Sequence, residues 1–94
     1  MGTKYGFVWV FVGENSRFPS GIFISFETGE KWIMEHKLTG VLTEYPLNEG
    51  VHDWAIAHGL FTPKKPEHSS PSFIGKFTCA SMEHFHFELG EMVQ

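Results

Sequence analysis

Hydrophobic and polar residues alternate along residues 82–89, near the end of the chain. With a period of two, a strand over this segment has one apolar face and one polar face. The two faces are Phe85, Phe87 and Leu89 on one side and His84, His86 and Glu88 on the other. This pattern is typical of a half-buried strand whose apolar side packs on a core.

Other segments also predict strands. Residues 5–12 are apolar at nearly every position, which favours a central strand buried on both faces. A polar turn over residues 13–19 separates it from a short strand over residues 21–25. A third strand is expected over residues 41–45, where Pro46 ends it.

The first helix is predicted to begin after Ser25, whose hydroxyl suits an N-cap, and to run from Phe26 to about Lys37. Gly29 inside it costs about 1 kcal/mol relative to alanine, so we expect a close approach to the sheet there. Gly40 is expected to close the helical region.

A second helix is predicted over residues 49–58, with Asn48 as its cap and Gly59 after its end. Its inward side should consist of Val51, Trp54 and Ala55. Residues 62–71 read as a loop within the domain, and Ser70-Pro71 as the start of a short third helix. That helix has one apolar side, formed by Phe73, Ile74 and Phe77.

The predicted fold is α+β, in the order β-β-α-β-α-α-β, with a mixed four-stranded sheet and helices mainly on one face. The helix over residues 26–37 makes a crossover long enough for a parallel unit. All 94 residues are expected to form one domain, with residues 90–94 as a frayed tail.

Composition and charge narrow the function. The chain is 41% hydrophobic and 16% aromatic, enough to close a core in a short domain. A net charge of −4, with Lys64-Lys65 as the nearest basic cluster, argues against nucleic acid. No segment reaches the ~20 apolar residues needed to span a bilayer. The single cysteine, Cys79, excludes an internal disulfide and favours a reducing, cytoplasmic setting.

The polar face of residues 84–88 is the main candidate for chemistry. On a strand, His84 and His86 lie about 6.5–7 Å apart at Cα, close enough for two imidazoles to share one ion. Glu88 follows on the same face, so these three residues are the candidate metal ligands, with Zn²⁺ as the ion. The sequence favours the other interpretation, a polar face that only contacts water, because a zinc site needs a third and usually a fourth ligand and the sequence names none.

Other reactive residues have simpler explanations. Asp53, beside His52, suits the first turn of a helix because the helix dipole favours a carboxylate there. Cys79 has no neighbouring base, and the chain contains neither a nucleophile elbow nor a phosphate loop. Three tryptophans fall on expected core positions and indicate packing rather than a stacking platform: Trp9, Trp32 and Trp54. The sequence therefore favours a non-enzymatic role.

Five phrases together resemble a family of short stand-alone bacterial proteins that is known only as a domain of unknown function. They are Phe18-Pro19-Ser20-Gly21-Ile22-Phe23, Glu30-Lys31-Trp32-Ile33, Leu42-Thr43-Glu44-Tyr45-Pro46-Leu47, Asp53-Trp54-Ala55-Ile56 and Glu83-His84-Phe85-His86. The resemblance covers roughly Val8 to Glu88 and implies a single domain of bacterial, cytoplasmic origin. It implies no catalytic residues.

Two functions stay open on the sequence alone. The first is a binding or regulatory module that occupies another protein's surface, as an immunity protein does. The second is a metal or small-ligand site on the strand that carries His84 and His86. The expected oligomeric state is a monomer or a weak homodimer.

Overall fold

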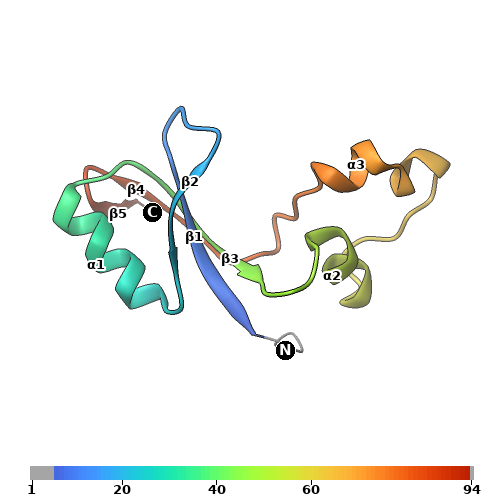
Figure 1. The fold of residues 1–94 in the computed structure, drawn as a ribbon, viewed down its shortest axis with the longest axis horizontal. Helices are drawn as coiled ribbons and strands as arrows, with labels where there is room; N and C mark the ends of the chain where they lie inside the picture. Colours follow the sequence, from blue (N-terminus) through green and yellow to red (C-terminus); the bar gives the residue numbers. More distant parts are fainter. Residues whose placement is uncertain (1–5, 94) are drawn as a thin grey trace.

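The computed structural model describes residues 6–93, which form a five-stranded antiparallel sheet flanked by helices (Figure 1). The strand order is β2-β1-β3-β4-β5. The strands are β1 (Phe7–Gly13), β2 (Pro19–Phe23), β3 (Gly40–Pro46), β4 (His84–Glu88) and β5 (Glu91–Val93). The helical elements are α1 (Phe26–His36), α2 (Val51–Ala57), the 3-10 turn η1 (Pro66–Ser69) and α3 (Pro71–Gly75).

The sheet is antiparallel throughout, so the prediction of a mixed sheet is wrong. Strands β2 and β3, which α1 connects, flank β1 on its two sides, and each pairs with it antiparallel. They therefore run in the same direction without being neighbours. The crossover was read correctly as a strand–helix–strand unit, but β1 occupies the position between its two strands.

The fifth strand corrects the predicted count of four, and it lies in the segment that was expected to fray. Residues 91–93 pair with β4, with Glu88 opposite Glu91. Leu89 and Gly90 form the two-residue turn, with φ of 50° and 88°. Positive φ at both positions is the geometry of tight hairpins, which usually have Asn-Gly there. Leu89, predicted on the apolar face of β4, is 74% exposed in this turn.

Helix α1 begins as predicted. The Ser25 side chain accepts a hydrogen bond from the Thr28 amide at 3.2 Å, which satisfies one of the free amides of the first turn. The helix ends at His36, one residue before the predicted end, and Lys37 caps it in a left-handed conformation. Gly40, which was expected to close the helical region, lies in β3. Gly29 is buried, and a Cβ there would lie 3.1 Å from Phe23 and 3.2 Å from Leu42. The expected close approach to the sheet is confirmed.

The second helix is shorter than predicted. It begins at Val51 with Gly50 as its N-cap and no capping side chain, so the assignment of Asn48 as the cap is wrong. Asn48 instead has a positive φ of 62° in the preceding turn. The cap at Ser70 is confirmed, because its hydroxyl accepts from the Phe73 amide at 3.2 Å.

The main core lies between the sheet and α1. Its buried members are Phe11, Ile33, Leu42 and Phe87. Half-buried aromatic and aliphatic side chains surround them, including Trp9, Phe26 and Phe85. The helix thus covers the face of the sheet to which Phe85 and Phe87 point. His84 and His86 are exposed, as the alternation in β4 predicts.

A second cluster joins the end of β3 to the segment of residues 51–77, called here the arm. Its buried members are Trp54, Ala55 and Met82. Figure 1 shows the arm, with α2 and α3, projecting away from the sheet on the side of the view opposite α1. The described chain measures 44 × 28 × 22 Å along its principal axes. Helix α1 covers the middle of one sheet face, and α2 packs only at the end of the sheet, where Trp54 meets Phe7 of β1 edge-on with ring centroids 6.4 Å apart. The prediction of helices mainly on one face therefore describes α1, whereas α2 and α3 lie in the arm.

Candidate functional site

Within residues 6–93, no helix packs over the middle of the sheet face opposite α1, although Tyr45 at its edge packs against the arm cluster of Trp54, Ala55 and Met82. Three outward positions of β1 point to this side, and they are Val8, Val10 and Val12. All three are half-buried, held by neighbouring strands and not by a covering layer. The prediction that β1 is buried on both faces is therefore wrong for this chain, although its position inside the sheet is confirmed.

The strand register arranges this surface in three rows. The first row is Ile22, Val10, Thr43 and His84. The second row is Val12, Val41, His86 and Val93. The third row is Val8 and Tyr45. We call these ten residues the open face.

The composition of the open face is unusual for a water-facing sheet surface. Antiparallel sheets with one solvated face normally carry polar side chains there. Here seven of the ten residues are valine, isoleucine or tyrosine, and the three rows contain no Lys, Arg, Asp or Glu. Ile22 is 66% exposed and Val93 41% exposed. Acidic residues lie beyond the second row, where Glu88 is opposite Glu91 and Glu14 lines the same hollow as His86.

The two predicted metal ligands on β4 lie side by side. The rings of His84 and His86 have centroids 5.7 Å apart and an interplanar angle of 79°. His84 Nδ1 lies 2.8 Å from the carbonyl oxygen of Met82. A carbonyl only accepts, so this nitrogen carries the hydrogen and Nε2 has the free lone pair.

Glu88 is on the same strand and exposed, but the structure does not gather it into a site with the two histidines. Within residues 6–93 there is no group of three His, Cys, Asp or Glu side chains placed to hold a metal ion. The two histidines also open onto different hollows. His86 lines one of about 500 Å³ with Val12 and Val41, and His84 lines one of about 220 Å³ with Cys79.

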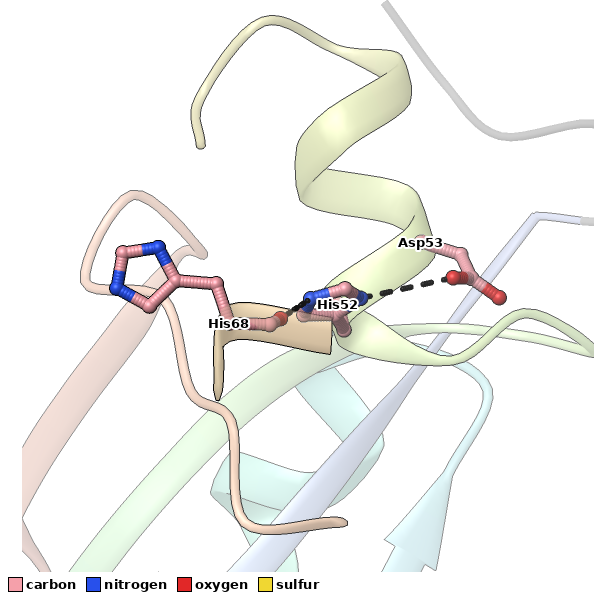
Figure 2. A network of polar contacts seen from close by, with 3 residues as sticks. All are labelled: His52, Asp53 and His68. Carbon is pink, nitrogen blue, oxygen red and sulfur yellow. Dashed lines mark hydrogen bonds and ion pairs between the residues drawn. The ribbon is translucent and has the colours of Figure 1, made fainter. Parts of the chain in front are cut away.

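A second polar site lies inside the arm. His52 is 5% exposed, and its Nε2 donates to the carbonyl oxygen of His68 at 2.9 Å (Figure 2). Its Nδ1 lies 3.7 Å from Asp53 Oδ1, beyond hydrogen-bond distance. The ring is surrounded by three phenylalanines, Phe61, Phe73 and Phe77, with centroids 5.2–6.0 Å away. This arrangement ties α2 to η1 and provides no nucleophile.

The buried position of His52 is the feature that sequence reasoning missed. The inward side of α2 was predicted as Val51, Trp54 and Ala55, and the structure confirms that Trp54 and Ala55 are buried. His52 widens that side by one position. The sequence did contain a sign of this burial. Residues 61–77 include three phenylalanines, and one alanine and one tryptophan of α2 offer too little apolar surface to pack against all of them.

One carboxyl group is perturbed on the α1 side of the sheet. Glu44 lies opposite Trp9 in the β1–β3 register. Burial raises the pKa of its carboxyl group above the ordinary value of 4.5, and the nearby negative charge of Glu83 raises it further. The group points away from the open face, so it belongs to the packing of the sheet.

Comparison with known proteins agrees with the resemblance seen in the sequence. The model of one protein family, described as a domain of unknown function, matches residues 8–93. No curated protein and no solved structure matches the chain significantly. Within residues 6–93, no helix has the length and apolar character needed to cross a membrane.

Proposed function

Because this chain belongs to the family DUF7710, whose function is unknown, we propose from its geometry that it is a protein-binding module that acts through the open face. The observation that carries the proposal is that β1 has apolar side chains on both of its faces. Its sequence has the composition of a strand covered on both sides, but α1 covers only one.

The uncovered side is suited to a protein partner. Large apolar patches on one chain mark interaction surfaces, because water contact with them is unfavourable. β-Branched side chains dominate the open face, and they have few rotamers to lose when they are buried. Polar groups within the rows, Thr43 and the two histidines, can orient the partner through hydrogen bonds.

This role matches a regulatory or immunity-like protein, which acts through the protein surface that it binds. It needs no reactive group. The single cysteine, Cys79, is free and half-buried, which suits the reducing cytoplasm.

Site-specific photocrosslinking tests this proposal. A photoreactive amino acid is placed at Ile22 on the open face, and in a matched variant at Met34, which is 56% exposed on α1. We expect covalent adducts with protein from Ile22 in cells, none from Met34, and loss of the Ile22 adducts when Val10→Lys is added. Equal labelling from both positions, or none from Ile22, contradicts the proposal.

A further inference from the structure

We infer that the partner seated on the open face is a second copy of this chain, and that His84 and His86 of both copies hold one Zn²⁺ between them. This inference rests on the proposed function and names its partner. It follows from the geometry of the histidine pair, the number of ligands that one chain supplies and the pattern of the rows.

The two imidazoles are spaced for a shared ion. With Zn–N bonds of about 2.0–2.1 Å and a tetrahedral angle, two ligand rings have centroids about 5 Å apart. The observed centroids are 5.7 Å apart, and both rings are exposed. The observed separation therefore exceeds that of two rings on one ion by less than about 1 Å.

His84 is already held in a ligating form. Its Nδ1–H donates to the Met82 carbonyl, which fixes the tautomer and directs the lone pair to Nε2. Metal-binding histidines generally have such a second hydrogen bond, because it orients the ring and raises its basicity.

One chain supplies only half of a site. Structural zinc is bound by four ligands, whereas the described residues offer this pair and no third His, Cys, Asp or Glu beside it. A two-fold axis doubles every group that lies near it. A second copy therefore completes a set of four imidazoles without any further residue.

The rows of the open face are compatible with that symmetry. Consider a two-fold axis that lies in the interface, perpendicular to the strands and midway between the first and second rows. It places each row against the other row of the second copy. His84 then faces His86 of the second copy, and Thr43 faces its Val41. Val10 likewise faces Val12 of the second copy, and the charged pair Glu88 and Glu91 lies beyond the two rows.

The size of the face explains why the dimer needs the metal. With strands about 4.8 Å apart and residues about 3.3 Å apart, the rows span roughly 400 Å² per copy. A stable interface buries about 800 Å² per partner. Apolar contact alone therefore supports a weak dimer, particularly for chains that each carry a net charge of −4. A shared ion adds attraction at the place where the two copies meet.

The test is sedimentation velocity of the purified chain at pH 7.5, with either EDTA or half an equivalent of Zn²⁺. We expect a change from one chain to two on adding zinc, with one bound zinc per two chains by elemental analysis. His84→Ala and His86→Ala should each abolish the zinc-driven dimer. The matched control is His36→Ala, which removes an exposed histidine of α1 and should leave the dimer intact.

A further variant separates the contact surface from the metal ligands. Val10→Lys keeps both histidines but should prevent dimerisation, and its circular dichroism spectrum reports whether the fold is retained. One zinc bound to a monomer, a dimer insensitive to zinc, or no zinc binding each overturns this inference. If this inference is overturned but photocrosslinks from Ile22 to another protein persist, the proposed function stands. If those photocrosslinks are also lacking, the proposed function and this inference are both wrong.

Discussion

Trp9 and Val10 are adjacent in β1 and face opposite sides of the sheet. Trp9 packs edge-on against Phe26 of α1, with ring centroids 5.3 Å apart. Val10 lies between Ile22 and Thr43 on the open face, where no helix covers it. The strand is thus apolar on two sides, while the chain shields one. This asymmetry is the physical basis of the proposed binding surface.

The two sides of β3 should respond differently to truncation. Leu42 is fully buried under α1, so Leu42→Ala should lower the free energy of unfolding by about 2–5 kcal/mol. Thr43→Ala, on the open face, should change it by less than about 1 kcal/mol in the monomer. Urea denaturation at low concentration measures both. Similar losses for the two variants would show that the monomer itself buries the open face.

A substitution in the turn between β4 and β5 should make the protein more stable. Leu89 has a φ of 50°, which costs a branched L-residue about 1–2 kcal/mol, whereas asparagine tolerates it. We expect Leu89→Asn to raise the free energy of unfolding by about 1 kcal/mol. The control is Leu60→Asn, which removes an exposed leucine outside the positive-φ set. An equal gain in the free energy of unfolding for both variants would show that the effect comes from removing an exposed leucine and not from the positive φ.

The stability of the arm should depend on the hydrogen bond that His52 donates. His52→Phe keeps an aromatic ring but leaves the His68 carbonyl oxygen without its donor. The expected loss of stability is about 1–3 kcal/mol. Hydrogen exchange locates it, since the amides of Ser70 and Ile74 should exchange faster while those of β1 keep their protection. A uniform change along the chain would contradict a local role, and His36→Phe serves as the exposed control.

Glu44 should make stability depend on pH. Burial, and then the charge of Glu83, raise the pKa of its carboxyl group above 4.5 in the folded chain. The folded state therefore holds the proton more tightly than the unfolded state, and stability falls as pH rises from 4.5 through the raised folded pKa. Glu44→Gln removes this penalty.

We expect Glu44→Gln to melt at a higher temperature than the wild type at pH 7 and at the same temperature well below pH 4.5. Glu83→Gln should give a smaller gain, because its charge is the lesser cause of the raised pKa. A lower melting temperature for Glu44→Gln at pH 7 would indicate that the carboxylate makes a favourable contact in the folded state.

Local signals in the sequence were sufficient for several elements. Ser25 and Ser70 mark helix starts because their hydroxyls satisfy free amides, and both caps are present. The alternation of Phe85 and Phe87 with His84 and His86 assigned the faces of β4, since a period of two leaves no other arrangement. The main candidate pair was therefore readable from the sequence.

The remaining features depend on contacts that a local pattern does not contain. The hairpin turn could not be predicted from the sequence, because leucine at position 89 does not indicate a positive φ. Instead, the turn is held by hydrogen bonds from Leu89 to the Thr39 hydroxyl and from Gly90 to the Leu38 carbonyl. His52 is buried only because the arm folds its phenylalanines around it. Burial of β1 on both faces was predicted wrongly, because an apolar composition does not show whether a second layer covers the strand.

Methyl NMR measures most directly whether the open face is covered by protein. With labelled valine and methionine methyl groups, a soluble nitroxide broadens those that contact solvent. We expect the methyls of Val10 and Val41 to become protected in the zinc-loaded chain at high concentration, while Met34 on α1 stays fully broadened. Equal broadening of Val10 and Val41 at all zinc and protein concentrations would contradict it.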